Sequence, residues 1–254
     1  MFDWLQKDKS FPKYGSYWVS VLIPTRGRPL KLAQALRSLH TRSGYSNEVE
    51  YLLWVDDDDK DTLKFLAAIK EWDGLPSLKT VVGPRGRGYL DLHVGLNTLA
   101  SVSLGDWIFC FNDDAEMLTY GWEQMFCGLI VSGDEAYGCP DGICMIIPNT
   151  LGRPKSPEFF AIHRKVYEVL GYLGPNMGID DWLSDIMGTV DRKIFCGLKI
   201  FHEDEDDQTF VEGRKSLTEK GIYELTASFQ VVRGRITDTL KLMDYIEKRC
   251  KGKQ

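Results

Sequence analysis

Five short apolar runs, each the length of one buried strand, constrain the fold of this chain more than any other feature. They are rich in Val, Ile, Leu and aromatic residues and span Val19–Pro24, Tyr51–Val55, Leu78–Val82, Trp107–Phe111 and Ile143–Ile147. Continuous apolar runs, as opposed to alternating ones, are typical of strands that are covered on both faces of a parallel sheet.

Segments with helical periodicity separate these runs. Pro29 opens a pattern in which Leu32, Leu36 and Leu39 share one face, as expected for a helix with proline in its first turn. Further helices are expected over Leu63–Trp72, Leu90–Ala100 and Trp122–Val131. This alternation predicts an α/β fold with a mostly parallel sheet and helices on both faces. Ligands of such sheets bind beyond the carboxyl ends of the strands.

The second half of the chain is less regular. Strands are expected over Phe159–His163 and Ile194–Phe201, the latter ending at His202, and short helices over Lys165–Leu170 and Asp181–Thr189. Beyond about Lys215 the pattern becomes helical and amphipathic, which predicts a domain over 1–215 and a helical C-terminal extension over 216–254. In that extension Ile236, Leu240, Met243 and Ile246 are spaced to share one face, which is expected to pack on the domain or on a partner.

Composition narrows the class of function. Lys and Arg total 31 against 37 Asp and Glu, a formal net charge of −6, so no basic surface for nucleic acid is expected. The six cysteines include no CxxC pair, which argues against a zinc ribbon or a thioredoxin-type site. The sequence has neither a membrane-spanning apolar run nor a visible signal peptide, which predicts a cytoplasmic protein. No basic amphipathic helix argues strongly for membrane attachment.

Adjacent carboxylates follow the fourth apolar run, in Asn112-Asp113-Asp114. Crowding such acids at a strand end is costly unless something positive sits between them. A divalent ion bound through oxygen ligands, and touching two phosphates, would remove that cost. The alternative interpretation is a solvated acidic turn, which is common for runs of Asn and Asp.

A second acidic run, Asp56 to Asp59, follows the second apolar run. Asp56 or Asp57, at the end of the strand, could accept hydrogen bonds from a nucleobase or a ribose hydroxyl. Asp58 and Asp59 are expected to begin the next helix, where acids favour the positive end of the helix dipole.

In their order and spacing these segments resemble the inverting family 2 glycosyltransferases with the GT-A (Rossmann-like) fold. Val19–Arg28 resembles the opening strand and nucleotide loop of that family, and Val55-Asp56-Asp57 resembles its second-strand aspartates. Asn97, followed by Gly105–Phe111, resembles the stretch that leads into the family's Asp-x-Asp motif. Here that motif is Asn112-Asp113-Asp114, with asparagine in place of the first aspartate.

The resemblance implies roles for individual residues. Asp114 and His202 would bind Mn2+ or Mg2+. His202 would be the late histidine that often completes the metal site of this fold. A lone histidine is otherwise more often structural. The residues implied to hold the nucleotide are Pro24, Thr25, Arg26, Asp56, Asp57, Arg85, Asn97, Asn112 and Asp113.

Gly174–Trp182 resembles the segment that carries the family's catalytic base. Asp181 aligns with that base, and Asp180 is its alternative. An acceptor hydroxyl that attacks an anomeric carbon must lose its proton, and a carboxylate within hydrogen-bond reach can take it. The competing interpretation is that both acids only begin a helix.

The implied function is metal-assisted transfer of a sugar from a UDP- or GDP-sugar to a glycan or another hydroxyl acceptor. Two alternatives stay open. A nucleotidyltransferase of related fold would show a basic glycine-rich loop after the first strand, of which Thr25-Arg26-Gly27-Arg28 is a poor version. A non-catalytic sugar- or nucleotide-binding module would explain why Asn112 replaces the first aspartate of the motif.

Overall fold

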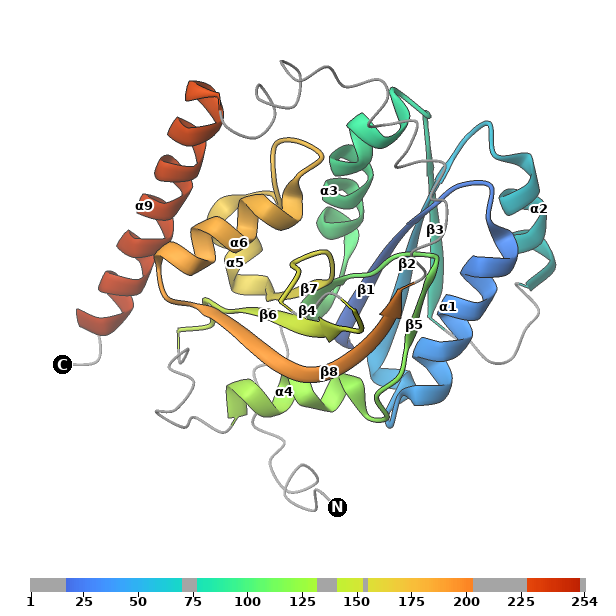
Figure 1. The fold of residues 1–254 in the computed structure, drawn as a ribbon, viewed down its shortest axis with the longest axis horizontal. Helices are drawn as coiled ribbons and strands as arrows, with labels where there is room; N and C mark the ends of the chain where they lie inside the picture. The colour runs from blue at the N-terminus through green and yellow to red at the C-terminus, as the bar shows by residue number, and fades with distance from the viewer. Residues whose placement is uncertain (1–16, 70–76, 132–140, 153–154, 203–227, 252–254) are drawn as a thin grey trace.

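The computed structural model describes residues 17–69, 77–131, 141–152, 155–202 and 228–251 (Figure 1). A single sheet forms the centre of the molecule, with the strand order β3-β2-β1-β4-β7-β6-β8-β5. Its strands are β1 (Tyr17–Thr25), β2 (Val49–Asp56), β3 (Leu78–Gly83), β4 (Gly105–Cys110), β5 (Ala115–Met117), β6 (Met145–Thr150), β7 (Phe160–His163) and β8 (Lys193–His202).

Most of the sheet is parallel. β1 pairs in parallel with β2 and β4, β2 with β3, and β6 with β8. The exceptions are β7, antiparallel to β4 and β6, and β5, antiparallel to β8. The predicted α/β architecture is confirmed. Strand β5 was not predicted, because three residues are too few to show a period.

Helices cover both faces of the sheet (Figure 1). They are α1 (Pro29–Arg42), α2 (Lys60–Ile69), α3 (Leu92–Val102), α4 (Trp122–Val131), α5 (Arg164–Leu170), α6 (Ile179–Thr189) and α9 (Phe229–Lys251). Short 3-10 turns lie at Ser46–Glu48 and Gly88–Asp91. One hydrophobic core lies between the sheet and α1, α2 and α4, and the other between the sheet and α3, α5, α6 and α9.

The central strands supply side chains to both cores. Val21 and Ile23 of β1 belong to one core and Leu22, between them, to the other. All three are fully buried. Because successive side chains of a strand point to opposite faces, a strand with helices on both sides needs an unbroken apolar run. This explains why the strands are so visible in the sequence.

Helix α9 is joined to the body by a buried carboxylate. Asp238 accepts hydrogen bonds from the Tyr172 hydroxyl, from Trp182 Nε1 of α6 at 3.2 Å and from Lys241 Nζ at 2.9 Å. Leu242, one turn further along, is buried in the same core. An unpaired buried carboxylate would be costly, so these donors account for its position.

Of the residues expected to pack on the domain or on a partner, Ile236, Leu240 and Met243 are exposed and do not pack on the domain. Ile246 does pack against the core. The face of α9 that packs on the domain is instead centred on the polar residue Asp238, which a hydrophobic pattern does not include.

The boundary predicted between 1–215 and 216–254 lies outside the described residues. Within the described ranges, none of the helices combines the length and the apolar character needed to cross a membrane.

His163, at the end of β7, makes stability depend on pH. Its Nδ1 accepts a hydrogen bond from the backbone N–H of Lys165 at 3.3 Å, and burial lowers its pKa from 6.5 to about 4. Between pH 6.5 and pH 4, His163 is protonated in the unfolded chain but neutral in the folded chain. The stability of the fold therefore falls as the pH falls from 6.5 towards 4.

We expect the free energy of unfolding, measured in urea, to fall when the pH is lowered from 7 to 5. This loss should be about 2 kcal/mol larger in the wild type than in His163→Asn. Asn can still cap α5 but does not titrate in this range. Equal losses in the two proteins would contradict this account.

Candidate functional site

The loop between β1 and α1 forms the middle of the candidate site. β1 ends at Thr25, and Gly27 has φ +64°, a left-handed conformation that favours glycine. Pro29 then begins α1. A backbone N–H at this position would have no acceptor within the helix, so proline, which lacks this N–H, is well tolerated there. The loop thus turns sharply between two well-defined elements.

The two acids beyond β4 are held by this loop. Thr25 Oγ1 donates to Asp113 Oδ2 at 2.7 Å. Arg28 places Nη2 2.7 Å from Asp113 Oδ1 and Nη1 2.7 Å from Asp114 Oδ2. The positive group expected between these crowded carboxylates is therefore supplied by the chain itself, as the guanidinium of Arg28.

Burial and charge act differently on the two acids. Burial raises the pKa of Asp113 to about 6, although the charge of Arg28 and the hydrogen bond from Thr25 oppose the rise. Burial also acts to raise the pKa of Asp114, but the hydrogen bond from His202 and the charge of Arg28 outweigh it, and the pKa is lowered. Asp114 is therefore the more firmly ionised of the two.

His202, the last residue of β8, lies beside Asp114. β8 pairs with β5 so that His202 is opposite Ala115, and its Nε2 is 3.2 Å from Asp114 Oδ1. Its Nδ1 is 3.6 Å from Glu158 Oε2. Burial acts to lower the pKa of His202, but the two carboxylates outweigh it and raise the pKa to about 9.

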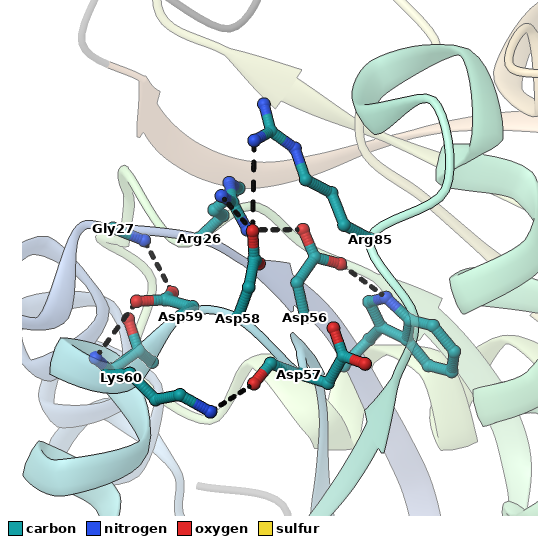
Figure 2. A network of polar contacts seen from close by, with 10 residues as sticks. Arg26, Gly27, Asp56, Asp57, Asp58, Asp59, Lys60 and Arg85 are labelled. Atoms are coloured by element: carbon teal, nitrogen blue, oxygen red, sulfur yellow. Dashed lines mark hydrogen bonds and ion pairs between the residues drawn. The ribbon is translucent and has the colours of Figure 1, made fainter.

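Figure 2 shows the acidic run beyond β2, which the same loop also contacts. Arg26 Nη1 donates to Asp56 Oδ2 at 2.9 Å, and Nη2 donates to Asp58 Oδ2 at 3.0 Å. Arg85, on the loop after β3, places Nη1 3.8 Å from Asp58. The other oxygen of Asp56 accepts from the indole nitrogen of Trp54 at 3.3 Å.

Asp59 connects the loop to α2. Its Oδ2 accepts from the backbone N–H of Gly27 at 2.7 Å, and its Oδ1 from that of Thr62 at 3.2 Å. Because Thr62 is in the first turn of α2, Asp59 caps this helix, as predicted. Asp58 instead pairs with Arg26, whose hydrogen bond lowers the pKa of that carboxyl.

The acids that resemble the catalytic segment lie in the first turn of α6. Asp181 is exposed, whereas Asp180 is half-buried. Burial and the charges of Asp181 and Glu158 raise the pKa of Asp180 to about 6. The charge of Asp180 also acts on the Cys110 thiol at the end of β4. The start of α6 therefore lies near the same edge of the sheet as His202 and Asp114.

Asn97 has a structural contact that sequence reasoning did not anticipate. Its Nδ2 donates to the carbonyl of Gly174 at 2.8 Å, and its Oδ1 accepts from the backbone N–H of Leu173 at 2.7 Å. Both ends of the amide thus hold the segment that leads into α6. A nucleotide contact by Asn97 stays a prediction.

The other predicted residues lie along the same edge. Pro24 is half-buried near the end of β1, Asn112 is half-buried just after β4, and Asp57 is exposed after β2. Thr25 is thus hydrogen-bonded to Asp113, and Arg26 to Asp56. Asp114 contacts His202.

Two residues of the site were missed from the sequence. Arg28 could have been found, since it stands in the same basic loop as Arg26. Glu158 had no signal of its own, because only folding brings it within 3.6 Å of His202.

Within the described residues, no three His, Cys, Asp or Glu side chains gather into a metal-binding cluster. Asp114 Oδ1 and His202 Nε2 are nevertheless 3.2 Å apart. Adjacent ligands of one octahedral ion, each about 2.1 Å from it, are separated by about 3 Å. The spacing of these two atoms therefore fits adjacent ligands of one divalent ion, which His202 would bind in its neutral form.

The mostly parallel sheet, with acids at two strand ends and a histidine at a third, has the GT-A fold. The sequence model of glycosyl transferase family 2 matches residues 20–170, more than half of the chain, and the chain belongs to this family. No curated protein sequence matches it.

Solved structures share the fold at low sequence identity. The mannosyltransferase PcManGT from Pyrobaculum calidifontis, in complex with GDP-Man and Mn2+, matches with a TM-score of 0.58 and 14% identity over 96% of this chain and 80% of that chain. TarS 1-349 from S. aureus, in complex with UDP-GlcNAc, has a TM-score of 0.59 and 12% identity over 87% and 66%. GalNAc-T7 with UDP, GalNAc and Mn2+ has a TM-score of 0.53 and 18% identity over 73% and 43%.

Removal of Arg28 should destabilise the protein, because Asp113 and Asp114 would then repel each other in a mostly buried site. We expect Arg28→Ala to lower the free energy of unfolding in urea by about 3 kcal/mol at neutral pH. Arg87→Ala is the matched control, since Arg87 pairs with Asp91 on the surface, and it should cost less than about 1 kcal/mol. Equal losses in the two variants would show that Arg28 does not hold the acids together.

Proposed function

We propose that this chain transfers a sugar from a UDP- or GDP-sugar to a hydroxyl acceptor, with inversion at the anomeric carbon. The observation that carries the proposal is the pairing of Asp114 with His202 beside the guanidinium of Arg28. A metal-ligand pair and a fixed cation side by side suit a diphosphate leaving group. Family membership supports the reaction class, and the nucleotides held by PcManGT, TarS and GalNAc-T7 support the donor class.

In this proposal Asp114 and His202 hold Mn2+ or Mg2+, which would neutralise charge on the diphosphate when bound. Arg28 stays close to both acids and adds a second positive charge. Asn112 can serve as a ligand through its carbonyl oxygen or accept a hydrogen bond from a ribose. The asparagine is therefore compatible with the site, although it contributes less charge than an aspartate.

The nucleoside is proposed to bind between the ends of β1, β2 and β3. Asp56 is held by Arg26 and Trp54, which fixes its carboxylate before any ligand arrives. Asp57, exposed beside it, would accept hydrogen bonds from the base or ribose. Arg85, on the loop after β3 and 3.8 Å from Asp58, would contact the diphosphate or the ribose. A carboxylate that is already oriented loses little conformational entropy when it binds.

Asp181 is proposed as the general base, because it is the exposed carboxylate of the pair and an acceptor can reach it. The acceptor oxygen forms a bond to the anomeric carbon while the bond from that carbon to the diphosphate oxygen breaks. The acceptor proton passes to Asp181, and the bonding electrons leave with the diphosphate. A single displacement from the opposite face inverts the anomeric configuration.

The nucleotidyltransferase alternative is less well supported. Such an enzyme is expected to carry a basic glycine-rich loop directly after its first strand, and Thr25-Arg26-Gly27-Arg28 holds only one glycine. The non-catalytic alternative predicts nucleotide binding without transfer, and the following experiment separates it from the proposal.

We expect Asp181→Asn to lower transfer from the preferred donor by at least about 100-fold, because a general base contributes roughly that much. The affinity for UDP or GDP, measured by calorimetry, should stay within about twofold, since Asp181 acts on the acceptor. Asp185→Asn is the matched control on the same helix, because Asp185 pairs with Arg235 on the surface, and it should retain full activity.

The variant Asp180→Asn tests whether Asp180, and not Asp181, is the general base. A smaller loss in Asp180→Asn than in Asp181→Asn supports the assignment. If Asp180→Asn abolished transfer and Asp181→Asn did not, the base would be Asp180. Binding of UDP or GDP with no transfer by the wild type, across a panel of UDP- and GDP-sugars and acceptors, would favour the non-catalytic module.

A further inference from the structure

Two neighbouring residues that precede β7 contact the side chain of His202. Glu158 Oε2 lies 3.6 Å from Nδ1 of the imidazole. The ring of Phe159 meets the imidazole at nearly a right angle, with 5.2 Å between the ring centroids. Phe159 is itself fully buried and packs against the ring of Phe111. One short segment therefore contacts both the imidazole ring and its Nδ1.

The sheet explains why Glu158 reaches this histidine. β7 begins at Phe160, which lies opposite Cys110, the last residue of β4. Because these two strands are antiparallel, the residues just before β7 lie beyond the carboxyl end of β4. Asp114 follows β4 at the same end, and β8 ends there with His202. Three separate segments thus bring their side chains to one place.

The two ring nitrogens of His202 face different carboxylates. Nε2 lies 3.2 Å from Asp114 Oδ1, and Nδ1 faces Glu158. All three side chains are largely buried, with exposed fractions of 14% for His202, 5% for Asp114 and 15% for Glu158. Among the described residues, Nδ1 has no partner at ordinary hydrogen-bond distance, and the carboxylate beside it belongs to Glu158.

A metal ion bound to Nε2 would decide where the imidazole carries its proton. The ion uses the lone pair of Nε2, so the neutral ring has its single N–H at Nδ1. A buried N–H without an acceptor is costly. Histidine ligands of metal ions therefore donate this second N–H to a carboxylate, a backbone carbonyl or water. At His202, Glu158 is in the position of that acceptor.

We propose that Glu158 is a positioning residue of the metal site, which accepts a hydrogen bond from Nδ1–H of His202 and keeps Nε2 directed at the ion. The present 3.6 Å is about 0.7 Å longer than a typical N–H···O hydrogen bond, and rotation about the side-chain bonds of Glu158 can remove this difference. The inference rests on the proposed function, because it needs His202 to be a metal ligand. Glu158 itself touches neither the ion nor the reacting atoms.

The alternative role for Glu158 is that of a general negative charge near the ion. Its charge also acts on Asp180 of α6, so the carboxylate influences more than one group of the site. The contacts favour the positioning role, since Phe159 and Glu158 hold the same ring from one segment. The two roles can be separated, because Glu158→Gln keeps an acceptor oxygen and removes the charge.

The test measures Mn2+ binding by the full chain. Mn2+ is titrated in the presence of UDP or GDP, whichever binds, and free Mn2+ is quantified by electron paramagnetic resonance. We expect Glu158→Ala to weaken the affinity for Mn2+ by about 10- to 100-fold, the usual effect of losing the partner of a metal-bound histidine. Glu158→Gln should stay within about threefold of the wild type, because its amide oxygen accepts the same hydrogen bond.

Electron spin-echo modulation from nitrogen reports whether His202 is bound to the ion. The wild type should show nitrogen modulation that His202→Ala lacks. At equal Mn2+ occupancy, Glu158→Ala should show weaker modulation, whereas Glu158→Gln should show the signal of the wild type. If Glu158→Ala does not fold, Glu158→Met takes its place, because it keeps the length of the side chain without a strong acceptor.

The matched control is Glu116→Ala, which removes an exposed carboxylate from β5, the strand that pairs with β8. Its Mn2+ affinity should equal that of the wild type. If Glu158→Ala binds Mn2+ as tightly as the wild type, with an unchanged nitrogen signal, the positioning role is overturned and the proposed metal site stands.

Two further outcomes would contradict the inference. Equal losses of affinity in Glu158→Ala and Glu158→Gln, or in Glu158→Ala and Glu116→Ala, would overturn it in favour of a general effect of charge. A wild type that binds no Mn2+, or binds it without nitrogen modulation, would overturn the metal assignment of the proposed function together with this inference.

Discussion

Two guanidinium groups on one short loop hold the acidic edge of this protein together. Arg26 contacts the acids beyond β2, and Arg28 contacts those beyond β4. Without these cations, carboxylates from two strand ends would repel each other at a partly buried edge. The interaction explains how a chain with a formal charge of −6 can collect so many acids in one place.

The sheet makes this arrangement possible. β1 lies between β2 and β4, so the loop that follows it can reach both neighbours. β8, which runs parallel to β6, brings His202 to the same edge from the far end of the sheet. The helices on both faces bury the central strands, and the candidate site is built from loops, strand ends and the first turn of α6. Arg26 and Arg28 already neutralise the carboxylates of this edge. They can exchange these contacts within the chain for contacts with a charged ligand.

Much of this could be predicted from the sequence, for physical reasons that differ between residues. Val21, Leu22 and Ile23 are visible as a strand because both faces of β1 are covered. Asp113 and Asp114 are conspicuous because adjacent acids at a strand end are costly to crowd together. Arg28 was overlooked because its role depends on a partner 85 residues or more away. Glu158 and the packed face of α9 were not predictable. The first acquires meaning only from its distance to His202, and the second is organised by a buried carboxylate that an amphipathic pattern treats as solvent-facing.

The central claim is that the carboxyl edge of the sheet receives a nucleoside diphosphate together with a divalent ion. Crystals soaked with UDP or GDP and Mn2+, measured at a wavelength where manganese scatters anomalously, test it directly. The account predicts one manganese peak within bonding distance of Asp114 and His202, with the diphosphate beside Arg28 and the nucleoside near Asp56 and Asp57. A nucleotide bound at another surface, with the contacts of Arg28 to Asp113 and Asp114 unchanged and no manganese at this edge, would contradict it.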